Sequence, residues 1–187
     1  GSFPTSASQV LHALLSSKDS DIAFIVWELR LPRILLAVLV GAALAVAGAI
    51  LQGIVRNPLA SPDVIGITSG AAMAAVIFLV LFSAGLSIHW LPVSALLGAL
   101  LAAVVVFFLA WKNGITPTRM VLVGIGLSAA MGAVTTLLIV ISDDAAAMYA
   151  YVWLTGSLYA AQWGDVLGML PWLLVAIPLC LAYARHM

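Results

Sequence analysis

The sequence is poor in charge. Of its 187 residues, only 7% are Asp, Glu, Lys or Arg, whereas 65% are hydrophobic and the mean hydropathy is +1.23. A water-soluble domain could not cover its surface with so few charged groups. The seven basic and seven acidic residues also cancel. That balance leaves no basic footprint for nucleic acid, so we expect no nucleic-acid partner.

The residues that perform chemistry are also scarce. Cys180 is the single cysteine, which excludes an internal disulfide. His12, His89 and His186 lie far apart in the sequence, and no apolar stretch carries the pair of acidic residues that acid-base catalysis would need. We therefore expect no enzyme activity, no metal site and no cofactor in this chain.

Long apolar runs dominate what is present. Residues 31–55 would extend about 37 Å as a helix, enough to cross a hydrocarbon core of about 30 Å. Turn-forming residues such as Pro58, Pro92 and Pro117 separate the runs. We predict an all-α polytopic transmembrane helix bundle over residues 30–187. Its five spans are 31–55, 63–84, 91–111, 118–142 and 166–185.

Two further segments have interfacial character. Residues 1–29 place leucines and isoleucines at helical spacing between charged residues, which is typical of short amphipathic helices at a membrane surface. Residues 145–163 concentrate Tyr and Trp, which favour the headgroup layer and predict an interfacial helix. Slightly more Lys and Arg fall on the inner side if the amino end is external, so we predict that residues 1–29 lie outside.

Small residues recur on single faces of two predicted spans. Such stripes let helix backbones pack closely. The alternative is that polar members line a path, because an amide or hydroxyl in lipid needs a partner. Gln52 and Thr135 are the candidates for path-lining residues. The two stripes are Gly41, Ala45, Gly48 and Gln52, and Gly124, Ser128, Met131 and Thr135.

The sequence supports two other functional classes less well than it supports a transport path. A membrane scaffold or assembly subunit would be satisfied by the small-residue stripes alone, but it has no need of the polar, proline-broken segment 57–61 beside Arg56. A transporter driven by an ion gradient would require a carboxylate inside a span, and the sequence offers only Asp63 at the start of one.

A dense set of motifs recurs along the chain: Arg30-Leu31-Pro32-Arg33, Val40 to Ala45, Gly48, Gln52, Asn57-Pro58-Leu59-Ala60, Pro62, Gly66 and Gly70. Trp153 to Ser157 and the segment opened by Arg119 add to this set. Together these residues resemble the signature of the FecCD-type permeases of bacterial ABC importers for iron siderophores, haem and cobalamin. The resemblance covers residues 25–187.

The resemblance implies a partner-dependent importer in the bacterial inner membrane. Family permeases have about ten transmembrane helices per subunit, pair with a second identical or homologous permease subunit, and work with a cytoplasmic ATPase and an external substrate-binding lipoprotein. By this analogy the chain would hold half of a permease, with one helix before Gly1 and the ATPase-coupling segment after Met187.

The same resemblance assigns candidate sites. Arg30 and Arg33 would dock acidic residues of the binding protein, with lipid anchoring as the alternative. Arg30, on the loop side, is expected to be the more accessible. Leu59, Pro117 and Thr118 would lie near the cytoplasmic gate of the pathway, with ordinary structural turns as the alternative.

Overall fold

The computed structural model describes residues 4–15, 21–58, 60–83, 85–112, 114 and 116–184. All regular secondary structure in these ranges is helical, which confirms the predicted all-α class. The chain divides into two compact units. One combines residues 1–46 with 158–187, and the other contains residues 47–157.

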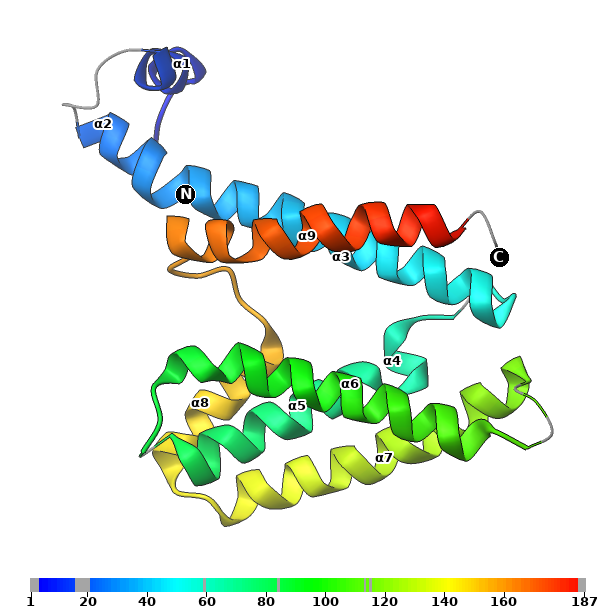
Figure 1. Cartoon of the computed structure of the whole chain (residues 1–187). Coiled ribbons are helices and arrows are strands. Elements are labelled where there is room, and N and C mark those ends of the chain that lie inside the picture. The colour runs from blue at the N-terminus through cyan, green and yellow to red at the C-terminus, as the bar shows by residue number, and fades with distance from the viewer. Residues whose placement is uncertain are drawn as a thin grey trace. The chain divides into compact units, whose positions relative to one another are not determined.

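The first unit is built from short amino-terminal helices and two long apolar ones. A small core forms where α1 and α2 meet the turn η1, through the buried side chains of Ala13, Ala23 and Val26. The Trp27 Nε1 donates a hydrogen bond of 3.0 Å to the Ala13 carbonyl and ties η1 to α1. The elements are α1 (Ala7–Leu15), α2 (Asp21–Phe24), η1 (Ile25–Arg30), the first part of α3 (Leu31–Val55) and α9 (Trp163–Ala184) (Figure 1).

The turn η1 is a π-helix, and the sequence explains its position. Pro32 has no N–H, and its ring would collide with the carbonyl four residues earlier in a regular α-helix. The ladder widens just before this proline, so that the Leu31 N–H reaches back five residues to the Val26 carbonyl. Pro32 itself is fully buried. The widened turn thus lets one helical run continue from Asp21 to Val55.

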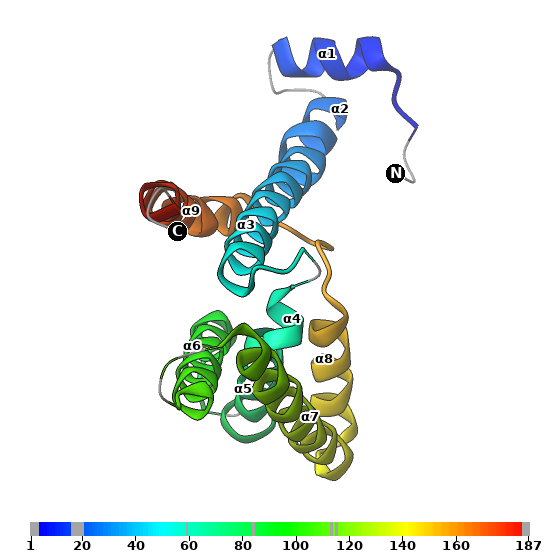
Figure 2. The same ribbon diagram turned by 90° about the vertical axis from the view of Figure 1, so that its right-hand side faces the viewer.

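The second unit packs the central helix α5 against its neighbours. Figure 2 shows α5 with α6 on one side and α7 on the other. Its main core joins Val76, Phe78 and Leu79 with Leu91 and Ile139. The elements are the end of α3, α4 (Pro62–Ile65), α5 (Ile67–Ile77), η2 (Phe78–Phe82), η3 (Ile88–Trp90), α6 (Leu91–Ala110), α7 (Pro117–Ile141) and α8 (Asp144–Thr155).

Glycines allow two very close helix contacts in this unit. A Cβ added to Gly70 of α5 would lie 2.6 Å from the Gly98 carbonyl oxygen of α6, and one added to Gly98 would lie 2.4 Å from the Gly70 oxygen. A Cβ added to Gly124 of α7 would lie 2.7 Å from the Ile65 Cα of α4. The backbones are therefore in direct contact at both places, as small residues permit in membrane helices.

The described helices refine the predicted spans. Four stretches are long and apolar enough to cross a membrane, and they overlap the predictions 31–55, 91–111, 118–142 and 166–185. Whether each crosses a membrane, and the predicted boundary at residue 30, stay predictions. The four stretches are Asp21–Val55, Ile88–Ala110, Pro117–Ile141 and Trp163–Cys180.

The predicted span over 63–84 is interrupted in the structure, and whether it crosses the membrane stays a prediction. Gly66 adopts a φ of 87°, a left-handed conformation that ends α4, and α5 begins at Ile67. The apolar helix that follows, Ile67–Phe82, is shorter than the four long stretches. The sequence signal was ambiguous because glycine is common inside transmembrane helices.

The expected interfacial helix before the last span corresponds to α8. Asp143 caps its amino end, since its carboxylate accepts a 2.8 Å hydrogen bond from the Ala146 N–H. Tyr149 and Tyr151 are exposed on this helix. The helix ends at Thr155, with Gly156 as its cap, earlier than the predicted limit of residue 163.

Candidate functional site

The first candidate site surrounds the two predicted docking arginines, all within the first unit. Arg30 is the last residue of η1, and Arg33 lies on the first turn of α3. Together with Glu28 they line an open cavity of about 1140 Å³, whose other wall is the segment 159–164. We call these residues, Glu28, Arg30, Arg33 and 159–164, the arginine rim.

The two arginines differ in accessibility, and the expectation for them was wrong. Arg33 is exposed, whereas Arg30 is half-buried and donates from its guanidinium to the Thr5 hydroxyl. This bond joins Thr5 to η1, a contact between distant residues that the local sequence could not predict. Arg33 is therefore the cation more fully presented to a partner.

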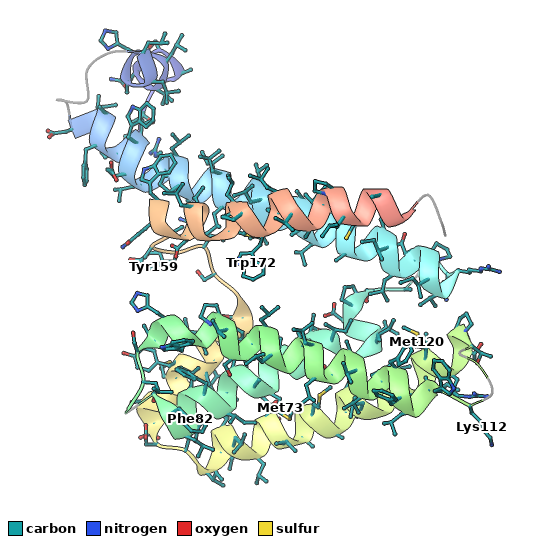
Figure 3. The ribbon with its side chains drawn as sticks, viewed as in Figure 1. Met73, Phe82, Lys112, Met120, Tyr159 and Trp172 are labelled. Carbon is teal, nitrogen blue, oxygen red and sulfur yellow. The ribbon has the colours of Figure 1, made fainter. Side chains whose placement is uncertain are left out.

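A hydrogen bond between two tryptophans joins the two walls of the arginine rim. The Trp163 Nε1, at the start of α9, donates a 3.0 Å hydrogen bond to the Trp27 carbonyl in η1. Beside it, Tyr159 is 82% exposed, and Figure 3 shows it in the segment that leads into α9. Ala160 has a φ of 58°, unusual for a residue other than glycine. The sequence placed Trp163 only among interfacial aromatics, because nothing local links it to residue 27.

The second candidate site joins two turns of the second unit. Asn57 and Pro58, after α3, and Pro117 and Thr118, at the start of α7, line one cavity of about 380 Å³. We call these four residues the proline turn cluster. The structure thus brings together two segments that the family resemblance placed near one gate. Leu59, the remaining gate candidate, lies outside the described residues.

The geometry of the α3 end follows from its hydrogen bonds. Arg56 has a φ of 52°, its N–H donates to the Gly53 carbonyl at 3.3 Å, and the Asn57 N–H donates to the Gln52 carbonyl at 3.2 Å. This is the Schellman pattern that ends many helices, here with arginine where glycine is usual. The pattern satisfies the last carbonyls of α3, and Pro58 prevents the helix from continuing.

Arg119 holds the part of the proline turn cluster that contains Pro117 and Thr118. Its guanidinium donates to the carbonyl of Lys112 at 3.0 Å and to that of Ala110 at 3.4 Å. These carbonyls lie at and just beyond the end of α6, where helix groups lack donors and the dipole favours a cation. In the sequence Arg119 stands out only as a motif residue, and no local signal predicts this cap.

The two candidate path-lining residues occupy different surroundings. Gln52 is exposed on α3. Thr135 is only 8% exposed, and its hydroxyl donates to the Met131 carbonyl of its own helix at 2.9 Å. One face of α7 therefore packs inward at Thr135. On the same helix the Ser128 hydroxyl is buried next to Gly66 and has no hydrogen-bond partner among the residues that the structure describes.

The second unit also contains an apolar cavity of about 600 Å³. Met73, Phe82, Trp90 and Met131 are among its lining residues, and Figure 3 labels two of them. Its serine, Ser94, already donates to the Ala74 carbonyl at 2.9 Å. Among the described residues, no group of three His, Cys, Asp or Glu side chains is placed to hold a metal ion.

Apolar helices of this length, with polar groups confined mainly to turns and helix ends, define an integral membrane protein. The model of the FecCD transport family matches residues 1–187, and the chain belongs to that family. This confirms the resemblance found in the motifs.

The relatives are permeases of similar sequence and greater length. The achromobactin transport system permease protein CbrC of Dickeya dadantii is 50% identical over 186 residues, covering 100% of this chain and 53% of that protein. The ferric enterobactin transport system permease protein FepG of Escherichia coli is 36% identical over 187 residues, covering 100% and 56%. The chain spans about half the length of the curated relatives it matches.

A solved structure has a similar fold. It shows an ABC transporter described as of metal-chelate type, in an inward-facing conformation. The TM-score is 0.71 at 32% identity, over 85% of this chain and 54% of that chain.

Proposed function

We propose that this chain is part of the transmembrane permease subunit of an ATP-driven importer. The permease would pass an iron-siderophore-like metal chelate from an external binding protein to the cytoplasm. The observation that carries the proposal is the family match over residues 1–187. A scaffold subunit, which only packs helices, would not need two polar sites that join distant segments. The scaffold alternative therefore has less support than the permease.

The proposed cargo follows from the relatives. They include the permeases named for ferric enterobactin in Escherichia coli and for iron(3+)-hydroxamate in Bacillus subtilis, the latter 40% identical over 190 residues. A cobalamin permease of Halobacterium salinarum is 45% identical over 166 residues. In each such cargo the chelator already fills most or all of the metal's coordination shell. The permease then needs a path of suitable width, not metal ligands of its own.

The proposal divides the work among several subunits. A cytoplasmic ATPase supplies the energy, a second permease subunit, identical or homologous, completes the path, and an external lipoprotein delivers the chelate. This assembly would lie in the bacterial inner membrane. The chain itself performs no bond chemistry.

Within this scheme the two sites have separate tasks. The arginine rim docks the binding protein through Arg30 and Arg33, because charge pairs at a rim set orientation and association rate. The proline turn cluster, with Leu59, forms part of the cytoplasmic gate. Irregular backbone at membrane depth must be sheltered by protein or line a cavity, and these turns line one. Exposed Gln52 stays a candidate for the path, whereas the internal bond of Thr135 favours packing.

Charge reversal in the complete permease tests the proposed function. We expect Arg30→Glu combined with Arg33→Glu to leave membrane insertion intact and to abolish uptake of a radiolabelled ferric siderophore by cells. A reciprocal Glu→Arg change on the binding protein should restore part of the uptake. Lys112→Glu, a reversal of an exposed cation on another turn, is the control. Normal uptake by the double reversal at equal protein level would leave lipid anchoring as the role of these arginines.

A further inference from the structure

We infer that Trp163 is a positioning residue for docking. It assembles the arginine rim from two segments that are remote in the sequence, by holding the turn that carries Arg30. The inference rests on the proposed docking role of Arg30 and Arg33, and it adds a residue that the family motifs did not include.

The hydrogen bond of Trp163 lies where Pro32 interrupts the helical ladder. In an α-helix the Trp27 carbonyl would accept from the Leu31 N–H, but that N–H is bonded to the Val26 carbonyl. In the π-helical register the donor would be residue 32, which is a proline and has no N–H. The Trp163 indole N–H bonds to the Trp27 carbonyl at 3.0 Å, as a donor from outside the helix. A half-buried carbonyl is stabilised by such a partner.

The same bond holds the two walls of the rim cavity together. Trp27 lies three residues before Arg30, and Trp163 belongs to the segment 159–164 that faces the arginines across the cavity. Trp27 also donates to the Ala13 carbonyl, so the chain of bonds continues to α1. A fixed rim presents its cations in one arrangement and loses little conformational entropy when a partner binds. A loosened η1 would release Arg30 and, one turn further, Arg33.

Trp163→Phe removes the N–H donor and keeps an aromatic ring, so it separates the hydrogen bond from packing. The measurement is the affinity of the full-length permease, in detergent or nanodiscs, for the substrate-binding protein of the same importer. We expect the Kd to rise about three- to tenfold, the range that one lost hydrogen bond produces. Trp172→Phe is the matched control. Trp172 lies on the same helix, is 69% exposed and should leave the Kd unchanged (Figure 3).

Two combinations distinguish positioning from general stability. In the Arg30→Glu, Arg33→Glu background, Trp163→Phe should cause no further loss of affinity, because there are no arginines left to position. Pro32→Ala gives the Trp27 carbonyl a donor from its own helix in either register, the Leu31 N–H if the helix becomes regular or the residue 32 N–H if it stays π-helical. Adding Trp163→Phe to Pro32→Ala should therefore leave the affinity near that of Pro32→Ala alone. The comparison of Pro32→Ala with the Pro32→Ala, Trp163→Phe double variant still tests the role of Trp163 if Trp163→Phe alone folds poorly.

The outcomes separate the two proposals. If charge reversal does not weaken binding, the docking function itself fails, whatever Trp163 does. If charge reversal weakens binding but Trp163→Phe behaves like Trp172→Phe, the positioning role of Trp163 is overturned. A lack of rescue by Pro32→Ala, in a variant that folds, would also contradict it.

Discussion

Arg119 shows how one cation can hold two helix ends. Its guanidinium bonds to two backbone carbonyls at and just beyond the end of α6, while its own backbone belongs to the first turn of α7. Pro117 and Thr118 directly precede it, so the bond fixes one wall of the proline turn cluster. Hydrogen bonds from a charged donor are stronger than neutral ones, and this position also complements the helix dipole.

Removing the guanidinium of Arg119 should destabilise the permease modestly. We expect Arg119→Gln to lower the free energy of unfolding by about 1 kcal/mol, because the carbonyls of Ala110 and Lys112 lose their charged donor. Thermal unfolding in detergent measures the effect. Lys112→Gln removes the same charge but keeps the Lys112 carbonyl, and the exposed side chain extends away from the turn (Figure 3), so it is the matched control. Equal melting temperatures for the two variants would show that Arg119 is no cap.

At the scale of helices, glycine decides where backbones touch. Stripes of small residues on α3 and α7 predicted close packing, and the α7 stripe does pack, with Gly124 against the backbone of Ile65. Within the described part of the chain, no atom of a neighbouring segment lies within 4 Å of where a Cβ on Gly41 or Gly48 of α3 would lie. A close crossing is found instead between Gly70 and Gly98, in α5 and α6.

Alanine at Gly98 should separate α5 from α6. The added methyl group would lie 2.4 Å from both the Ala74 Cβ and the Gly70 oxygen, so the helices must move apart. We expect Gly98→Ala to lower stability by about 1 to 3 kcal/mol, the usual cost of overpacking.

The control for this prediction lies on a neighbouring helix. A Cβ at Gly126, on α7, would meet no atom of the described residues within 4 Å, so Gly126→Ala should be neutral or stabilising by up to about 1 kcal/mol, since alanine favours helix. Denaturant titration of the purified permease compares the two variants. A Gly98→Ala protein as stable as the Gly126→Ala protein would refute the close crossing.

At the scale of the whole molecule, the sequence predicted the features that depend on local pattern, namely the helical class, the extent of single helices and the family. The apolar runs gave the helical class and the extent of α3, Leu31–Val55, because length and hydropathy alone define such a helix. The motifs gave the family. The break at Gly66 was missed because a glycine within an apolar run has the same appearance in a straight helix and at a left-handed cap.

Contacts between distant segments could not be predicted from one sequence. The bond from Trp163 to the Trp27 carbonyl joins residues 136 positions apart, and the bond from Arg30 to Thr5 reversed the expected accessibility of the two arginines. The pairing of Asn57 and Pro58 with Pro117 and Thr118 was reached only through family resemblance. Each of these contacts depends on how the helices pack in space. The sequence gives the order of the helices along the chain, but it does not give their positions relative to one another.

The most direct test of the central claim is transport by purified components. The complete permease is reconstituted in proteoliposomes with its ATPase, and the binding protein loaded with a radiolabelled ferric siderophore is added on the outer side. We predict accumulation inside the vesicles that requires ATP, the binding protein and the intact arginine rim, so that the Arg30→Glu, Arg33→Glu permease accumulates none. Accumulation of the chelate without ATP or binding protein, or none at all with every component present and the ATPase active, would contradict the assignment of this chain to an ATP-driven chelate importer.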